Sequence, residues 1–322
     1  MTSRTLRRVL LALLAVAVSI GLAACGDNKK SSSTSSGASA PTSGAQPGKG
    51  KPPIRMGDKN FAEQYVLGQL YKQALEAKGF TVSLKDNIGS SEITDKALKA
   101  GQIDMYPDYT GTVVAELAHN PPTSRPKSAD EAYAKAKAYE EKSGFTLLEK
   151  TPFVDADANA VLKSFASKHG LKTTSDLKKL PSFTFGAPPE NKTRFEGVVG
   201  MRQVYGLNKL KFVPLAIGLQ YQALDSGKID VGVVFTTDGQ LLGDTKYKIL
   251  DDDKAIYGFQ NVAPVVKKDL LTKEGPAFAE TVNAVSAKLT NDAVRRMNQA
   301  VSVNKQKPAA VAMQFLKANG LA

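Results

Sequence analysis

The sequence predicts an α/β protein built from two lobes. Apolar residues alternate between strand spacing and helix spacing along most of the chain, which indicates mostly parallel sheets flanked by helices. About 270 residues follow Ile54, more than one ordinary domain needs. One short pattern also occurs twice. These three observations favour two lobes, each with its own central sheet.

The repeated pattern is a helix, a glycine turn and a strand. It is written first as ALKAGQIDMYPDYTG (97–111) and again as ALDSGKIDVGVVFTTDG (223–239), so that Tyr109 corresponds to Phe235. Ligands bind beyond the carboxyl ends of strands in open α/β sheets. If each copy belongs to one lobe, we expect Tyr109 and Phe235 to approach one ligand from opposite sides of a cleft. Convergence on a common turn, with Phe235 a core residue, is the alternative.

The predicted elements follow from hydrophobic periodicity and from glycine stops. The apolar residues of Phe61–Ala77 recur at helical spacing, and Gly79 ends that helix. Strands are expected at Ile54–Gly57, Thr81–Leu84, Ile103–Tyr106, Phe145–Leu148, Ala160–Leu162, Thr184–Gly186, Phe212–Pro214, Asp230–Phe235, Lys248–Leu250 and Asn261–Val266. Further helices are expected at Ser91–Ala100, Val113–Leu117, Ala129–Lys142, Arg194–Tyr205, Leu219–Ser226, Pro276–Leu289, Asp292–Val301 and Ala309–Asn319.

The first 53 residues predict export and a lipid anchor. Three arginines precede an apolar run over 9–24, which is shorter than the about 20 residues of a membrane span and is typical of a secretory signal. The run ends in Leu-Ala-Ala-Cys, so residues 1–24 are expected to be a signal peptide and Cys25 the lipidated first residue. The alternatives are an uncleaved signal anchor and an ordinary signal with a chance cysteine. Residues 25–53 are rich in Ser, Gly and Pro and predict a disordered tether.

Composition and motifs argue against several function classes. The formal net charge is +12, but the basic residues are scattered among acids, so no nucleic acid is expected as a partner. Cys25 is the only cysteine, and neither His119 nor His169 has a partner at metal-ligand spacing. The chain also lacks a nucleophile elbow and a phosphate-binding loop. We therefore expect no enzyme, no metal and no cofactor.

Several stretches resemble one family in the same order along the chain. GDKNFAEQ (57–64) resembles the G-S-K-x-F-x-E-Q opening of the glycine betaine/choline (ProX/OpuAC-type) substrate-binding proteins of ABC importers, and IDMYPDYTGT (103–112) resembles their I-D-x-Y-P-E-Y-T-G-T. Further blocks similar to the family are FGAPPENKTR (185–194), GLQYQAL (218–224), FTTDGQL (235–241) and NVAPVV (261–266). The resemblance runs from about residue 54 to the C-terminus.

The resemblance implies a type II periplasmic-binding-protein fold with the ligand in the interlobe cleft. Residues 54–153 and 264–322 would form lobe 1, and residues 154–263 would form lobe 2. Two crossing segments would then act as a hinge that closes around the solute. No residue of this scheme takes part in covalent chemistry.

The resemblance also implies roles for individual residues. Tyr109 matches a wall of an aromatic cage for a cation, and Phe235 falls where the family often has another. Lys59 and Arg194 match the cations that hold a ligand carboxylate, with Thr112 as a hydroxyl donor. Asn60 and Gln64 share the first loop and are expected to line the cleft. Lys59 as a plain surface lysine is the alternative.

Two positions depart from the aromatic cage of the family. Asn159 stands where the family usually has a cage tyrosine, and Gln260 stands where a second tyrosine is often found. Tyr257 and Phe259 lie close to Gln260 in sequence. Asp155 and Asp157 either add negative charge for a cationic ligand or are solvated hinge residues.

Together these features predict a monomeric, extracytoplasmic lipoprotein that captures a quaternary-amine osmoprotectant. Glycine betaine, proline betaine, carnitine and choline are the expected solutes, and a permease and an ATPase are the expected partners. One alternative keeps this class with a different betaine-like or aromatic amine ligand. Others are an exported enzyme on the same scaffold and a signalling or adhesion lipoprotein that binds no small solute.

Overall fold

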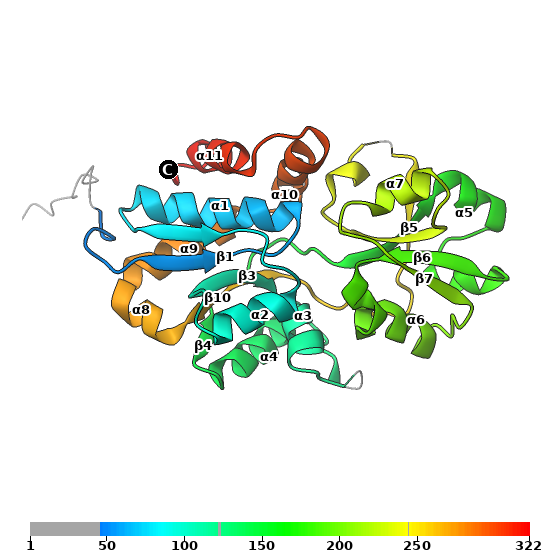
Figure 1. The fold of residues 1–322 in the computed structure, drawn as a ribbon, viewed down its shortest axis with the longest axis horizontal. Coiled ribbons are helices and arrows are strands. Elements are labelled where there is room, and N and C mark those ends of the chain that lie inside the picture. Colours follow the sequence, from blue (N-terminus) through cyan, green and yellow to red (C-terminus); the bar gives the residue numbers. More distant parts are fainter. Residues whose placement is uncertain (1–45, 122–123, 244) are drawn as a thin grey trace, which may run out of the picture. The chain divides into compact units, whose positions relative to one another are not determined.

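The computed structural model describes residues 46–121, 124–243 and 245–322, and these contain two five-stranded sheets. The strand orders are β2-β1-β3-β10-β4 and β7-β6-β8-β5-β9 (Figure 1). The strands are β1 (Ile54–Gly57), β2 (Val82–Lys85), β3 (Met105–Tyr109), β4 (Phe145–Leu147), β5 (Asp157–Leu162), β6 (Phe183–Ala187), β7 (Leu210–Pro214), β8 (Val231–Phe235), β9 (Tyr247–Leu250) and β10 (Val262–Lys267). All ten strands lie at predicted positions, with ends shifted by a few residues.

Helices pack on both sheets. They are α1 (Ala62–Ala77), α2 (Ser91–Lys99), α3 (Thr110–Thr112), α4 (Ala129–Glu141), α5 (Lys163–His169), α6 (Gly200–Gln203), α7 (Gln220–Asp225), α8 (Lys268–Glu274), α9 (Pro276–Lys288), α10 (Asn291–Asn298) and α11 (Pro308–Ala318). Short π-helical segments follow α3 (Val113–Leu117), precede α6 (Phe195–Val199) and follow α10 (Gln299–Val303). We call the first sheet with α1–α4 and α8–α11 the first lobe, and the second sheet with α5–α7 the second lobe.

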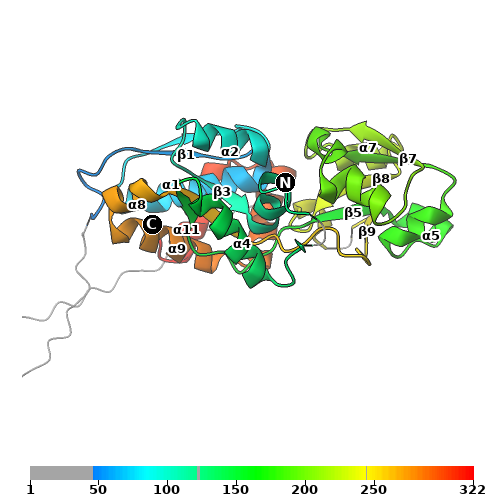
Figure 2. The same ribbon diagram turned by 90° about the horizontal axis from the view of Figure 1, so that it is seen from below.

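Alternation along the strands builds a core on each face of a sheet. In β3, Met105 belongs to one apolar cluster and Tyr106 to the other, and both side chains are fully buried. Helices α1, α9 and α11 pack together over the first cluster, while α2 and α4 cover the other face. Figure 2 shows α2 and α4 on the side that lies below the first sheet in Figure 1.

Four strands of each sheet run in the same direction, as expected, but each sheet is mixed because one strand, β10 or β5, runs against the other four. In both sheets the first three strands pair in parallel, and the remaining two pairings are antiparallel. The antiparallel partner enters from the other lobe: β10 begins at Val262 opposite Tyr109, and β5 begins at Asp157 opposite Phe235. A strand that enters at the edge where its neighbour ends must run the opposite way. This entry point brings both crossing segments to the predicted cleft.

The sequence repeat corresponds to one structural unit in each sheet. Tyr109 ends β3 and Phe235 ends β8, the middle strands of the two sheets. The turn glycines before them have φ of 72° and 69°, a left-handed conformation that favours glycine. The repeated aspartates accept hydrogen bonds from the neighbouring strand in the same way, Asp104 from the Arg55 backbone N–H and Asp230 from the Thr184 backbone N–H. The repeat therefore records a shared structure at two strand ends.

Two crossing segments, residues 148–156 and 251–261, connect the lobes (Figures 1 and 2). They pair with each other, since Val154 and Asn261 form an antiparallel bridge and the Asp155 N–H donates to the Gln260 carbonyl. The Asn261 side chain also donates to the Thr151 and Phe153 carbonyls. The limits of the two lobes given above stay a prediction.

We predict that Asp104 stabilises the first lobe through its charge. Its carboxylate accepts bonds from the Arg55 backbone and guanidinium and from Lys267. Because charge-assisted bonds contribute about 1.5–3 kcal/mol, Asp104→Asn should lower the free energy of unfolding by about 2 kcal/mol at neutral pH. Burial raises the pKa of Asp104, but Arg55 and Lys267 outweigh it and lower the value to about 2. The contribution is therefore present above the unfolded pKa near 4 and is lost as the pH falls toward 2.

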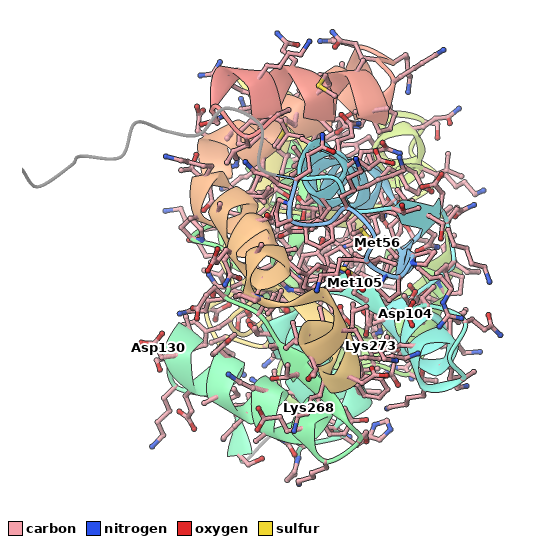
Figure 3. The ribbon with its side chains drawn as sticks, turned by 90° about the vertical axis from the view of Figure 1, so that its left-hand side faces the viewer. Met56, Asp104, Met105, Asp130, Lys268 and Lys273 are labelled. Atoms are coloured by element: carbon pink, nitrogen blue, oxygen red, sulfur yellow. The ribbon has the colours of Figure 1, made fainter. Side chains whose placement is uncertain are left out.

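Asp130→Asn is the matched control. The Asp130 side chain is 88% exposed and pairs only with Lys150 among the described residues. Figure 3 labels both aspartates on the first lobe. Urea unfolding of both variants at neutral and acidic pH is the measurement. Equal effects of the two substitutions at neutral pH would contradict the role given to Asp104.

Candidate functional site

A small polar cleft lies where the two middle strands end. Its volume is about 50 Å³, and both lobes and both crossing segments contribute to its wall. Eight of the ten predicted site residues line it, and Gln64 and Asn159 do not. The eight are Lys59, Asn60, Tyr109, Thr112, Asp157, Arg194, Phe235 and Gln260. Asp155, Glu190, Asn191 and Glu196 also line the cleft.

The aromatic wall contains a ring that the sequence prediction missed. Phe61 stacks on Phe235 with a centroid distance of 5.1 Å and on Tyr109 with 6.2 Å. Phe61 therefore stacks on both rings, and the simple picture of Tyr109 and Phe235 on opposite sides of a ligand is incomplete. Phe61 fits the helical spacing of the apolar residues in 61–77, which predicts that its side chain lies on the core face of that helix. The structure instead puts Phe61 at the N-cap of α1 with extended backbone (φ −151°, ψ 164°), and its side chain lines the cleft.

Lys59 is buried and already paired. Its ammonium lies 2.6 Å from Asp108 Oδ1 and donates to Ser91 Oγ at 2.9 Å. It also lies 4.1 Å from the centroid of the Tyr109 ring, within the range of a cation–π contact. Burial lowers the pKa of Lys59, although Asp108 opposes the shift. A protein cation thus already contacts the ring predicted to receive the ligand's cation.

The hydroxyl of Tyr109 is fixed by a network that joins the lobes. It donates to Glu63 Oε1 at 2.7 Å, and Glu63 Oε2 accepts from Thr237 Oγ1 at 2.5 Å. Asn298 also donates to Glu63 Oε2 at 2.8 Å. Burial raises the pKa of Glu63, opposed by these donors. Tyr109 is therefore held at its outer end as well as by its backbone.

The expectation that Gln64 lines the cleft is not met. Gln64 lies inside α1 rather than in the preceding loop, is fully buried, and donates to the Tyr109 hydroxyl at 3.2 Å. The side-chain oxygen of Gln64 (Oε1) accepts a bond from the Lys59 backbone N–H at 3.4 Å. It supports two cleft residues from behind.

Asn159 is also turned away from the cleft. It is two residues further along β5 than Asp157 and fully buried in the second lobe. Its amide accepts from the Tyr257 hydroxyl at 2.9 Å and donates to Thr174 Oγ1 at 3.1 Å. The tyrosine near Gln260 in sequence therefore completes an internal polar cluster with Asn159.

Gln260 bridges the two lobes inside the cleft. Its Oε1 accepts from the Thr112 backbone N–H at 3.0 Å and from the Thr112 hydroxyl at 3.3 Å, while its Nε2 donates to both oxygens of Glu196 at 3.0 Å. A Cβ on Gly111 would lie 2.7 Å from the Gln260 amide, so glycine leaves room for this bridge. The Thr112 hydroxyl, predicted as a ligand donor, is engaged by Gln260.

Arg194 forms a two-bond ion pair with Glu92 of the first lobe. Nε donates to Oε1 at 2.9 Å and Nη2 donates to Oε2 at 2.8 Å. Burial pushes the pKa of Glu92 upward, but Arg194 outweighs it and the pKa falls to about 2. The same pairing raises the pKa of Arg194 against the effect of burial. The guanidinium predicted to hold a ligand carboxylate thus holds a protein carboxylate.

The remaining cleft carboxylates have no such cation. Among the described residues, no ion pair joins Asp155, Asp157 or Glu196 to a lysine or arginine. Burial raises the pKa of Asp157 to about 6, and Arg194 acts in the opposite direction. Burial, followed by nearby carboxylates, raises the pKa values of Asp155 and Glu196 well above their usual range. These upward shifts favour the uncharged forms of Asp155 and Glu196, so Asp157 is the buried carboxylate that brings negative charge to the cleft at neutral pH.

Comparison with known proteins identifies the family. The model of the substrate binding domain of the ABC-type glycine betaine transport system matches residues 52–318. The chain belongs to this family. It is thus a solute-binding protein of ABC transporters and not an enzyme, and it works on the outer side of the membrane.

Relatives and solved structures agree with this assignment. A glycine-betaine-binding protein of Pseudomonas aeruginosa is 30% identical over 280 residues, which are 83% of this chain and 88% of the relative. The carnitine transport binding protein OpuCC of Listeria monocytogenes is 27% identical over 276 residues, 84% of this chain and 88% of the relative. A crystal structure of a glycine betaine/carnitine/choline ABC transporter matches with a TM-score of 0.67 and 26% identity, covering 83% of this chain and 99% of that one. The predicted type II periplasmic-binding-protein fold is confirmed.

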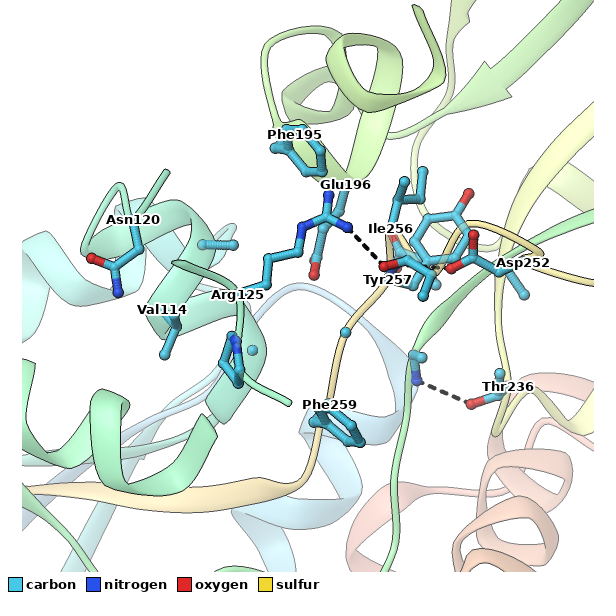
Figure 4. Close-up of a pocket in the computed structure, with 18 of the residues that line it drawn as sticks. Val114, Asn120, Arg125, Phe195, Glu196, Thr236, Asp252, Ile256, Tyr257 and Phe259 are labelled. Atoms are coloured by element: carbon cyan, nitrogen blue, oxygen red, sulfur yellow. Dashed lines mark hydrogen bonds between the residues drawn. The ribbon is translucent and has the colours of Figure 1, made fainter. Parts of the chain in front are cut away.

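This protein has a second, larger cavity next to the cleft. Its volume is about 530 Å³, and it shares Asp157 and Glu196 with the cleft. Figure 4 shows Arg125 reaching from the first lobe toward Phe195 and Tyr257. The Arg125 guanidinium lies 4.1 Å from the Phe195 ring centroid and donates to the Ala255 carbonyl at 2.8 Å. Apart from these groups and a few carboxylates, the wall is mainly apolar.

The N-terminal predictions lie outside the described residues. These include the signal peptide, Cys25 and most of the tether. Within 46–121, 124–243 and 245–322, no helix combines the length and the hydropathy that a bilayer span needs.

The ion pair of Arg194 and Glu92 makes a direct prediction for titration. In the unaltered chain the carboxyl carbon shift of Glu92 should follow a pKa near 2, well below the usual value. Arg194→Gln should raise that pKa above about 4, because burial then acts without its counterion. Arg125→Gln, which removes a cation that does not touch Glu92, should leave it low. A Glu92 carboxyl that titrates in the usual range in the unaltered chain would contradict the pairing.

Proposed function

We propose that this chain captures a small quaternary-ammonium solute in the cleft and delivers it to an ABC permease driven by an ATPase. The observation that carries the proposal is the combination of aromatic rings and the Asp157 carboxylate, which has no ion-pair partner among the described residues, in one buried cleft. A quaternary ammonium has no N–H to donate, so aromatic faces and Coulomb attraction are what can hold it. Phe61 and Phe235 supply the faces, and Asp157 supplies the charge.

The size of the cleft requires movement of its walls. A volume of about 50 Å³ corresponds to about two water molecules, less than a trimethylammonium group needs. Opening about the paired crossing segments would admit the solute, and closure would desolvate it against the carboxylates. The contacts between Glu63 and Thr237 and between Arg194 and Glu92 would then break and re-form in each cycle.

We keep the predicted role of Lys59 and Arg194 in binding a ligand carboxylate. In this proposal the ligand carboxylate competes with the protein carboxylates that already pair with these two cations. Each cation has a protein carboxylate, so a zwitterionic solute has to displace Glu92 or bind a remaining edge of Arg194. Thr112 and Asn60 line the same part of the cleft and would orient the solute.

The larger cavity favours a second candidate ligand. A solute with a bulky apolar body, such as an aromatic amine, would place its cation against Asp157 and its body in the 530 Å³ space. Volumes of 300–1,000 Å³ are usual for pockets that hold such ligands. Binding of benzyl-substituted ammonium compounds in preference to choline would support this candidate.

For localisation we propose that the exported chain is held at the outer face of the cell membrane through lipid on Cys25. The lipobox and the apolar run before it support this, and residues 25–53 would then act as a tether to a monomeric binding unit. Cys25→Ser should release the expressed protein from the membrane fraction. Retention of that variant in membranes would contradict the anchor.

Calorimetric titration of residues 46–322 with choline, glycine betaine and carnitine tests the proposed function. Phe61→Ala should weaken binding of each quaternary amine about tenfold, because cation–π contacts contribute about 0.5–2 kcal/mol each. Phe165→Ala is the control, since this ring packs on His169 in the second lobe away from the cleft. Absence of binding for all three solutes, or equal effects of the two substitutions, would contradict the proposal.

Binding of a cation should also depend on pH. Burial raises the pKa of Asp157 to about 6, with Arg194 and Lys59 acting against burial and Glu190 acting with it. Burial and the charge of Asp157 in turn raise the pKa of Glu196. A bound cation favours the ionised carboxylate, so protons are released on binding near pH 6. The affinity for choline should fall by up to about tenfold from about pH 7 to about pH 5, and Asp157→Asn should flatten this dependence. An affinity that rises as the pH falls would exclude Asp157 as a partner of the cation.

A further inference from the structure

The guanidinium of Arg194 is aimed at the cleft but engaged by Glu92. Arg194 precedes the π-helical segment that leads into α6 and lines the cleft wall. Glu92 is the second residue of α2, and its neighbours Ser90 and Ser91 line the same wall. The Ser90 hydroxyl donates to Glu92 Oε2 at 2.6 Å and so holds the carboxylate in place. The ion pair thus stands at the edge of the solute cleft.

The geometry of this pair is the one that a solute carboxylate would adopt. Two parallel N–H···O bonds of 2.9 and 2.8 Å join the guanidinium to the carboxylate. This fork is what makes arginine a strong carboxylate receptor. Because Glu92 uses Nε and Nη2, a solute carboxylate can form the same two bonds only by displacing it.

We propose that Glu92 is the specificity-determining residue of the cleft, which occupies Arg194 and thereby directs selection toward solutes with net positive charge over those that carry a carboxylate. This inference rests on the proposed function, because it takes the cleft to be the site of a quaternary ammonium.

The charges around the cleft support this assignment. Lys59, the other cation of the wall, is paired with Asp108 at 2.6 Å. With both cations neutralised inside the protein, Asp157 and Glu190 set the sign of the potential that a solute meets. A choline molecule brings one positive charge to this surface. Glycine betaine adds a carboxylate that meets these two groups unless Arg194 is released.

The pair also contributes to stability and closure, because its two-bond geometry and partial burial make it stronger than an ordinary surface ion pair. Loss of the pair would weaken closure for every solute to the same degree. The ratio of two dissociation constants cancels that common term, so it isolates the effect on specificity.

The experiment measures choline and glycine betaine by calorimetry on residues 46–322, unaltered and with Glu92→Gln. The two solutes differ only in their hydroxymethyl and carboxylate ends. We expect Glu92→Gln to raise the ratio Kd(choline)/Kd(glycine betaine) about tenfold or more, since a freed guanidinium regains charge-assisted bonds to the carboxylate.

Glu190→Gln is the matched control for charge. It removes the same charge from the cleft wall by the same substitution, but Glu190 makes no side-chain bond to Arg194 among the described residues. We expect it to shift the ratio in the same direction but by no more than about threefold. Equal shifts for the two variants, or an unchanged ratio for Glu92→Gln, would overturn the inference while leaving the proposed function intact. Binding of neither solute by the unaltered chain would instead overturn the proposed function, and the inference with it.

Discussion

The buried ion pair between Lys59 and Asp108 fixes the arrangement of the first lobe's side of the cleft. Asp108 accepts bonds from Lys59, from the Ser91 hydroxyl, from the Tyr106 hydroxyl and from the Tyr109 backbone N–H, at 2.6–2.9 Å. One carboxylate thereby joins the loop after β1, the start of α2 and the end of β3. Breaking such a pair by removing one partner costs about 3–5 kcal/mol, because the other charge is left buried. The geometry of this ion pair therefore constrains the three segments that Asp108 joins.

Two features of the cleft follow from this constraint. The start of α2 is held next to Lys59, and so Glu92 stands where it can reach Arg194 of the other lobe. The Lys59 ammonium is paired with Asp108, so it does not neutralise Asp157. The protein thus keeps a carboxylate without an ion-pair partner of its own at a buried surface lined by Phe61 and Phe235. Such a surface disfavours anions and suits a poorly hydrated cation.

The sequence predicted the features that leave a local or repeated pattern. Hydrophobic period predicts all ten strands, although it ends the third at Tyr106, and the repeat of 97–111 in 223–239 places Tyr109 and Phe235 at corresponding positions. Residues matched to family motifs, such as Lys59, Tyr109 and Arg194, line the cleft, and their roles in ligand binding stay predictions. These successes share one cause, since backbone position follows from short-range sequence.

The ion pairs that set the charge of the cleft, and the side chains that face it, could not be predicted in the same way. Glu92 and Arg194 are 102 positions apart, and nothing local marks either as the partner of the other. Phe61 looked like a core residue because it fits helical spacing, yet the helix begins one residue later. Gln64 and Asn159 lie close in sequence to cleft residues but face the interior of a lobe. A displacement of one helical turn or one strand step is enough to move a side chain from the wall to the core.

A crystal structure of residues 46–322 with bound choline tests the central claim most directly. The account predicts that the quaternary nitrogen lies within about 6 Å of the Phe61 or Phe235 ring centroid. It also predicts Asp157 as the nearest charged group, with Arg194 still bonded to Glu92. A choline held outside the cleft, with no contact to these rings or carboxylates, would contradict it.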